Sequence, residues 1–401
     1  MRLSPLIQVK AGAQLGQTIF GPVGQPLLNA GVELSPEYLE QLHARGMHSV
    51  YVEDPDTSDI EIPQPISPER RAKVTANLAQ AFSAISDRTE SLRESYTAVA
   101  RKHMESQRFA DAIRAVAGGE GLYTVAGDID GMLDELKGRS ILAGLNSIKA
   151  HDSYTFQHCI DVTIMGLVLA RSLNWERWRL RAFGVGCILH DMGKLFIDPG
   201  ILNKPGKLTD DEYDQIKAHP VVGYDLIKAM ASGLGVLAPH VAYQHHERQD
   251  GTGYPRGIKG TNTMGENAPE KIHDFGSLSA VADVYDAMTS DRPYRAGWTP
   301  ERTLAMIRDG AGKHFNRQAV SIMMSIVPPY PVCSNVKVTN GKYAGFEGIV
   351  ASVPRNDLTR PKVRLLTNVQ GQRVDPVEIN LAVEKDVAIE AAPTAKVAAA
   401  A

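Results

Sequence analysis

The stretch Ile188-Leu189-His190-Asp191-Met192-Gly193-Lys194 places an imidazole and a carboxylate side by side at the end of an apolar run. A neutral histidine nitrogen and an aspartate oxygen can ligate the same cation, and a lysine three residues further on can reach a bound anion. On its own, a histidine–aspartate pair is more often a surface pair or a hydrogen bond at a helix end. The stretch therefore predicts the nucleus of a metal site only if other parts of the chain supply further ligands.

The composition is typical of a globular protein. The chain has 401 residues, of which 43% are hydrophobic and 22% charged, so we expect two or three domains. The formal net charge of -3 gives no general attraction to nucleic acid polymers or anionic membranes, so an anionic ligand has to be held by local charge. The sequence contains no signal peptide and no apolar run of about 18 residues, which predicts a cytoplasmic protein without membrane insertion. Cys159, Cys187 and Cys333 are far apart and are expected to be buried small hydrophobes.

The hydropathy pattern predicts a multidomain, mainly α protein. Short apolar runs and a helix after Ser35-Pro36 predict a small α+β module in residues 1–60. A helical connector is expected in 67–140, where apolar residues from 74 to 99 recur at three- and four-residue steps. This stripe either packs on the chain's own core or forms a coiled-coil dimer seam, and the small number of repeats favours the core.

The central part of the chain, 141–330, is predicted to be an all-α helical bundle. Its segments 159–173 and 180–189 are apolar on most faces, which is typical of helices inside a bundle. After this part, short strand-like runs separated by turns predict a small β domain in 332–390. The alanine-rich stretch 391–401 is predicted to be a disordered tail.

Side chains that can ligate metals recur where the predicted apolar helices begin or end. Each of them alone is more simply explained as a capping or hydrogen-bonded core residue. Together they supply five imidazoles and at least two carboxylates from separate helices, which is how metal sites in bundle cores are built. The residues are His158, His190, Asp191, His219, His245, His246 and Asp283, and Asp286 lies in the same apolar stretch as Asp283.

The type of ligand favours iron or manganese. Nitrogen and oxygen ligands without thiolate, sufficient for two divalent ions bridged by one aspartate, suit six-coordinate iron or manganese better than a closed tetrahedral zinc site. Two ions held by a common carboxylate can share a hydroxide and clamp a phosphodiester, so the predicted reaction class is hydrolysis of a phosphate ester. Lys194, Arg292 and Arg295 would neutralise the substrate phosphates.

A second informative stretch runs from His245 to Pro255, with the sequence HHERQDGTGYP. Gly251 and Gly253 permit a tight loop directly after the paired histidines. Tyr254 is then presented beside the metal site, where its ring could stack on a base or its hydroxyl could bond a phosphate. A plain turn is the alternative interpretation.

In this order, the motifs resemble the HD-GYP branch of the HD phosphohydrolases. They are His190-Asp191, the 245–255 loop and the stretch from Ala282 to Arg295, and the match covers about 150–320. The resemblance implies an all-helical domain that hydrolyses the bacterial second messenger cyclic di-GMP to linear pGpG or GMP. It implies metal ligation by His158, His190, Asp191, His219, His245, His246 and Asp283. It also implies substrate binding by Lys194, Tyr254, Arg292 and Arg295, and catalytic roles for Asp191, Lys194 and Asp286.

One position departs from the family pattern. Members with a third metal carry a glutamate four residues before the first histidine, and here that position is Tyr154. Asp152 lies two residues away, which turns it to another face of a helix. We therefore expect two metal ions.

Two other functions fit the same motifs. The chain could be a non-catalytic cyclic dinucleotide receptor or an adaptor for a signalling protein, or a phosphodiesterase for another cyclic dinucleotide. The intact ligand positions favour an active enzyme. The oligomeric state, including a possible homodimer, and the signal sensed by the N-terminal part stay open, because no receiver motif or small-molecule pocket is apparent there.

Overall fold

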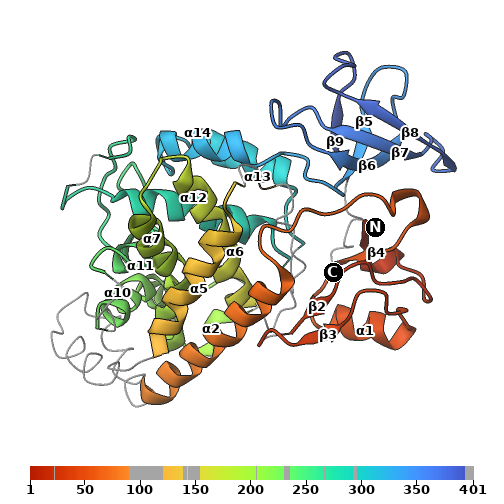
Figure 1. Ribbon diagram of the computed structural model, residues 1–401. Helices are drawn as coiled ribbons and strands as arrows, with labels where there is room; N and C mark the ends of the chain where they lie inside the picture. The colour runs from red at the N-terminus through yellow and green to blue at the C-terminus, as the bar shows by residue number, and fades with distance from the viewer. Residues whose placement is uncertain are drawn as a thin grey trace.

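The computed structural model describes residues 1–21, 23–89, 121–138, 142, 154–204, 206–229, 235–265, 268–291 and 296–392. Helices form the larger body, and the N-terminal elements and a C-terminal sheet lie together beside it (Figure 1). The prediction of a mainly α chain with a small C-terminal sheet is confirmed. Within the described residues, no helix combines the length and the apolar character needed to cross a membrane.

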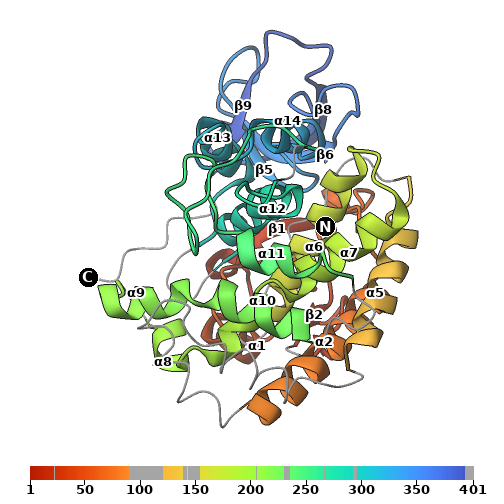
Figure 2. The same ribbon diagram turned by 90° about the vertical axis from the view of Figure 1, so that its left-hand side faces the viewer.

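The helical body is built around three helices that are buried on nearly all faces, α6, α7 and α12. Phe183 of α7 lies at their centre, with its ring centroid 5.0 Å from that of Phe275 and 5.6 Å from that of Trp175. In Figure 2, α10, α11 and α12 lie next to one another across the body. The helices are α2 (Pro68–Thr89), α5 (Gly121–Glu135), α6 (Tyr154–Arg171), α7 (Arg177–Leu189), the 3-10 helix η5 (Met192–Phe196), α8 (Pro199–Leu202), α9 (Asp210–Lys217), α10 (His219–Ala229), α11 (Pro239–Gln244), α12 (Asp274–Thr289), α13 (Pro300–Asp309) and α14 (Arg317–Ile326).

Helix α2 carries the first part of the predicted apolar stripe. Val74, Leu78, Ala81 and Ile85 are buried in the hydrophobic core of the helical body. In the described part of the chain, the stripe therefore packs on the protein's own core. The rest of the stripe, beyond residue 89, lies outside the described residues.

The N-terminal part consists of two small antiparallel sheets and one helix. Strand β1 (Arg2–Pro5) pairs with β4 (Ser49–Val52), and β2 (Ile19–Phe20) pairs with β3 (Pro26–Leu28). Helix α1 (Pro36–Ala44) begins where the sequence indicates, because Ser35 Oγ accepts a hydrogen bond from Tyr38 N and proline occupies the first helical position. The short 3-10 helices η1 (Leu6–Gln8) and η2 (Pro55–Thr57) complete this part.

The C-terminal sheet has the antiparallel strand order β8-β7-β6-β5-β9. Its strands are β5 (Asn335–Val338), β6 (Glu347–Ser352), β7 (Lys362–Thr367), β8 (Arg373–Asn380) and β9 (Ile389–Ala391). The predicted start of the disordered tail at residue 391 is wrong, because Ala391 pairs with Val336 and donates a hydrogen bond to Glu301 of α13. The remainder of that tail, 393–401, lies outside the described residues.

The N-terminal part and the C-terminal sheet pack against each other. Tyr51, Ile349 and Leu366 belong to one buried hydrophobic cluster. Around this cluster, Arg364 bonds Asp59 at 2.7 Å and Arg373 bonds Asp54 at 2.6 Å. The two ends of the described chain therefore contact each other as well as the helical body.

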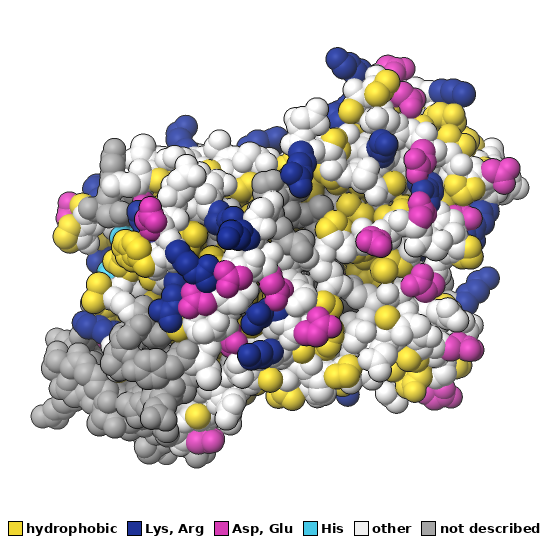
Figure 3. All heavy atoms as spheres, in the orientation of Figure 1, with side chains coloured by type: hydrophobic (Ala, Val, Ile, Leu, Met, Phe, Trp, Pro, Cys, Tyr) yellow, Lys and Arg dark blue, Asp and Glu magenta, His cyan; other side chains and the backbone are white. Residues whose placement is uncertain are grey.

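On the face seen in Figure 3, basic and acidic side chains alternate over the helical body. Arg177 pairs with Asp134 and Arg181 with Asp130 on neighbouring helices. These exposed pairs contribute little to stability. The buried aromatic residues contribute more to the free energy of unfolding than these pairs do.

We expect Phe183→Ala to lower the free energy of unfolding by about 3–5 kcal/mol, because the fully buried ring leaves a cavity at the centre of the body. Trp178→Ala on the same helix is the control, since Trp178 is 64% exposed, and we expect its cost to stay below about 0.5 kcal/mol. Denaturant unfolding measures both values. An equal loss of unfolding free energy in the two variants would contradict the placement of Phe183 at the centre of the core.

Candidate metal centre

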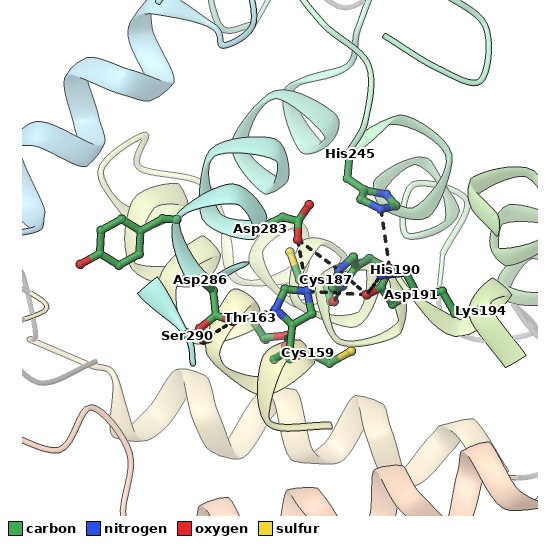
Figure 4. A network of polar contacts seen from close by, with 12 residues as sticks. Cys159, Thr163, Cys187, His190, Asp191, Lys194, His245, Asp283, Asp286 and Ser290 are labelled. Atoms are coloured by element: carbon green, nitrogen blue, oxygen red, sulfur yellow. Dashed lines mark hydrogen bonds and ion pairs between the residues drawn. The ribbon is translucent and has the colours of Figure 1, made fainter. Parts of the chain in front are cut away.

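The side chains predicted to ligate metal come from separate helices and converge in the interior of the helical body. His158 lies in α6, His190 and Asp191 follow α7, His219 begins α10, His245 and His246 follow α11, and Asp283 lies in α12. Figure 4 shows Asp283, His190, Asp191 and His245 pointing toward one another. The sequence places these residues far apart, and the bundle brings them together.

Gly193 is required for this convergence. A Cβ atom at this position would overlap the carbonyl oxygen of His219 and crowd the backbone nitrogen of Gly223. Without a side chain, the turn after Asp191 can pack directly on the first turn of α10. This close approach brings Asp191 next to His219.

Asp191 lies between two groups of imidazoles. Its Oδ2 is 3.6 Å from His158 Nε2 and 3.5 Å from His190 Nε2. Its Oδ1 is 3.5 Å from His219 Nε2 and 3.9 Å from His245 Nε2. The carboxylate thus presents one oxygen to each group, which is the arrangement of a bridging ligand.

Each of the two groups contains three side chains whose ligand atoms lie close enough together to bind one metal ion. In the first, the ligand atoms of His158, His190 and Asp283 lie within 4.8 Å of one another. In the second, those of His219, His245 and His246 do the same. A third cluster, His190, Asp191 and His245, overlaps both groups, so Asp191 joins two adjacent sets of side chains in the described residues that could bind metal ions.

Hydrogen bonds on the outer side of the rings determine which nitrogen faces inward. The Nδ1 atoms of His190, His219 and His245 donate to the backbone carbonyls of Cys187 (2.7 Å), Ile216 (2.7 Å) and Ala242 (2.9 Å). A neutral ring that donates through Nδ1 has an unprotonated Nε2. The inward nitrogens are therefore lone-pair donors, as metal ligation requires.

Two polar atoms at the centre have no hydrogen-bond partner among the described residues. Among the buried side-chain atoms of the described residues, His190 Nε2 and Asp191 Oδ1 accept no hydrogen bond. The Nε2 atoms of His219 and His245 lie 3.2 Å apart, although neither carries a proton in the tautomers above. A buried carboxylate oxygen and facing lone pairs are unfavourable without a cation, so this donor set fits metal ions.

The pKa values are shifted in the direction that ligation needs. Burial lowers the pKa of His245 to about 4 and lowers the pKa of His219 well below its usual value. Burial alone would raise the pKa of Asp191, but the His190 imidazole and the Lys194 ammonium beside it hold that pKa well below its usual range. Near neutral pH the imidazoles of His219 and His245 are therefore neutral and the Asp191 carboxylate is ionised.

Comparison with known proteins identifies this part of the chain. Residues 146–319 match the HD domain family. This part of the chain is an HD domain. The resemblance to the HD-GYP branch that the motifs indicate is confirmed by the relatives.

Among the relatives, the cyclic di-GMP phosphodiesterase PA4108 of Pseudomonas aeruginosa is 33% identical over 244 residues, which are 61% of this chain and 55% of that protein. The cyclic di-GMP phosphodiesterase response regulator RpfG of Xanthomonas campestris pv. campestris is 37% identical over 161 residues, 40% of each protein. The 3'3'-cGAMP-specific phosphodiesterase 3 of Vibrio cholerae is 34% identical over 166 residues, 40% of this chain and 33% of that protein. The chain thus spans about half the length of the first relative, and less of the other two.

Asp286 of the HD domain contacts His158 rather than an open face of the site. Its Oδ2 lies 2.7 Å from His158 Nδ1, and Ser290 Oγ is 3.4 Å away. Whereas the family resemblance implies a catalytic role for Asp286, the geometry favours a role in orienting His158, since a carboxylate behind a histidine fixes its tautomer.

Lys194 and Tyr254 lie at the edge of the centre. Lys194 Nζ is 2.6 Å from Asp191 Oδ2, and its side chain is 27% exposed. The Tyr254 ring stacks on His246, with centroids 4.7 Å apart and an interplanar angle of 23°. Burial raises the pKa of Tyr254, so its hydroxyl stays protonated at neutral pH.

Glu247, for which the sequence indicates no role, supports the loop after the paired histidines. Its buried carboxylate accepts hydrogen bonds from Arg256 N at 2.8 Å and Ile258 N at 3.1 Å. Both nitrogens follow Tyr254, so Glu247 holds the loop that carries this ring. The sequence does contain a signal for this role, because Glu247 directly follows two ligand histidines and precedes a loop with two glycines.

Four residues that the sequence singles out are not described, or only in part. Asp152, Arg292 and Arg295 lie outside the described residues. Tyr154 is the first residue of α6, and its side chain is likewise outside them. Asp291, directly before the two arginines, accepts hydrogen bonds from Gly297 N (2.8 Å) and from His48 N of the N-terminal part (3.4 Å).

We expect Asp286→Asn to weaken metal binding about 10- to 100-fold, because the amide no longer provides the charged acceptor behind His158. Metal affinity is measured by competition with a chelator, with Asp309→Asn on the surface as control. A variant with unchanged metal affinity but a lower turnover number would instead support a direct role on substrate.

Proposed function

We propose that the protein is a metal-dependent phosphodiesterase that hydrolyses cyclic di-GMP to linear pGpG, GMP or both. The observation that carries the proposal is Asp191, whose two buried oxygens each face a separate group of imidazoles. A carboxylate in this position is suited to bridge two cations, and paired cations are a common device for phosphodiester hydrolysis.

The proposed ligands follow the two clusters. His158, His190 and Asp283 would hold one ion, His219, His245 and His246 the other, and Asp191 both. Ligands of this type without thiolate favour iron or manganese. When bound, divalent ions supply Lewis-acid activation of a phosphate ester and of a water nucleophile.

The protein's own residues have separate tasks in this proposal. Asp286 orients His158 through Nδ1. The ammonium group of Lys194, next to Asp191 and partly exposed, attracts a substrate phosphate. Tyr254 contributes an aromatic wall beside His246, and Arg292 and Arg295 are proposed, from the motif, to bind the phosphates.

The substrate class is supported by the names of the relatives, of which two are called cyclic di-GMP phosphodiesterases. A relative named as specific for 3'3'-cGAMP supports a second candidate, a phosphodiesterase for another cyclic dinucleotide. We also propose that the N-terminal α+β module and the C-terminal β domain are accessory regions, through which a second copy or a signalling protein would act.

Hydrolysis is tested with purified protein loaded with manganese or iron under anaerobic conditions. We expect turnover of cyclic di-GMP, faster than that of 3'3'-cGAMP, and its loss after chelation. Asp191→Asn should lose metal and activity together, because one carboxylate serves both clusters, whereas the exposed Asp211→Asn should retain both. Metal-loaded protein that binds cyclic di-GMP without cleaving it would favour the receptor function instead.

A second variant separates metal binding from substrate binding. We expect Arg295→Ala to raise the KM about tenfold or more, the effect of losing a charged hydrogen bond of roughly 1.5–3 kcal/mol, at unchanged metal content. Elemental analysis and steady-state kinetics are compared with Arg308→Ala, an exposed arginine of α13. A loss of metal in Arg295→Ala would show that the proposed division of roles is wrong.

A further inference from the structure

A cavity separate from the metal clusters lies where the N-terminal part meets the helical body. It has a volume of about 220 Å³, and its lining includes the segment 16–20, Ala30, the linker residues 62 and 64–66, Pro68 and Arg71 of α2, and Gln157 of α6. We call it the seam cavity. None of its lining residues belongs to the metal clusters, and its parts are too far apart in sequence to be recognised as a pocket there.

The walls of the seam cavity are mainly apolar. Ile19 and Ile66 are almost completely buried, and Phe20 and Ile62 complete the apolar lining. Ligand sites typically combine such walls with a few polar groups and often lie between domains. Here the charged group is the guanidinium of Arg71.

The guanidinium of Arg71 uses only one of its nitrogens for hydrogen bonds to other described residues. Its Nη1 donates to Asp161 Oδ1 at 2.8 Å and to Gln157 Oε1 at 3.2 Å. Within the described residues, its Nε and Nη2 donate no hydrogen bond, although the side chain is only 15% exposed. These two groups present parallel N–H bonds along one edge of the guanidinium, which matches the two oxygens of a carboxylate.

The volume limits the size of the ligand. An engineered apolar cavity of about 150 Å³ holds benzene, so the seam cavity admits a molecule somewhat larger than that. Benzoate, phenylacetate and hexanoate have the right size and carry one carboxylate.

We propose that the seam cavity binds a small organic carboxylate with a compact apolar body, and that binding is communicated to the metal centre through α6. Asp161 and Gln157 hold Arg71 and lie three residues after and directly before His158. A carboxylate on Arg71 shares the guanidinium with the buried Asp161, which changes the contact that holds this turn of α6 against α2. Binding is independent of the proposed phosphodiesterase function, whereas its effect on hydrolysis rests on that function.

The binding site is tested by calorimetric titration of the full chain with benzoate, phenylacetate and hexanoate. We expect saturable binding of at least one of them in the micromolar to millimolar range, and at least tenfold weaker binding of the matching alcohol. Ala30→Trp places a large side chain at an exposed lining position and should abolish binding, whereas Ala382→Trp on the C-terminal sheet should not affect it. Absence of binding for all three acids, or equal binding by Ala30→Trp, would overturn the site.

Arg71→Lys tests the role of the guanidinium. Lysine keeps the positive charge beside Asp161 but cannot present two parallel N–H groups, so we expect a folded variant with about tenfold weaker carboxylate binding. Unchanged affinity in this variant would overturn the assignment of the ligand as a carboxylate held by Arg71.

The coupling is tested at the metal centre without using activity. We expect saturating carboxylate to change the Mn²⁺ affinity several-fold in the wild-type protein, and to leave it unchanged in Ala30→Trp. Carboxylate binding without any change in Mn²⁺ affinity would overturn the communication through α6. A protein that binds the carboxylate and Mn²⁺ in this coupled way but cleaves no cyclic dinucleotide would contradict only the phosphodiesterase proposal.

Discussion

The buried carboxylate of Asp191 is the constraint on which the rest of the helical body depends. It lies among the imidazoles of His190, His219 and His245, whose pKa values burial lowers, and one of its oxygens accepts no hydrogen bond from the described residues. Leaving a buried polar atom unsatisfied costs about 1–3 kcal/mol, and more for a charged group. The apolar packing of α6, α7 and α12 must offset this cost in the metal-free protein, and bound cations would remove it.

Helix ends explain how the sequence orients most of the ligands. His190, His219 and His245 each come directly after the last turn of a helix, where backbone carbonyls have no partner in the helix. Each ring donates its Nδ1 proton to the carbonyl three residues earlier, which points Nε2 into the centre. The same groups that terminate α7, α9 and α11 therefore set the tautomer of the ligands.

The metal site and the C-terminal sheet could be predicted from the sequence. The repeated placement of histidines at the ends of apolar helices indicates a bundle-core metal site, and the change to short strands after residue 330 indicates the C-terminal sheet. Two features were not predictable, because they depend on long-range contacts. Ala391 pairs with β5 and donates a hydrogen bond to Glu301, and the seam cavity is formed by segments far apart in sequence that only the fold brings together.

His158 shows why Asp286 needs a different interpretation from the one its motif suggests. This histidine lies inside α6, where the carbonyls of the preceding turn are used by the helix itself, so its Nδ1 needs an acceptor from another element. Asp286 of α12 supplies it at 2.7 Å, and thereby ties α12 to α6. The same turn of α6 is held on a neighbouring face by Arg71 of α2, which donates to Gln157 and Asp161. His158 thus lies between a contact that orients its ring and a contact that reaches the N-terminal part, which makes α6 the element through which a change at the seam would reach the metal centre.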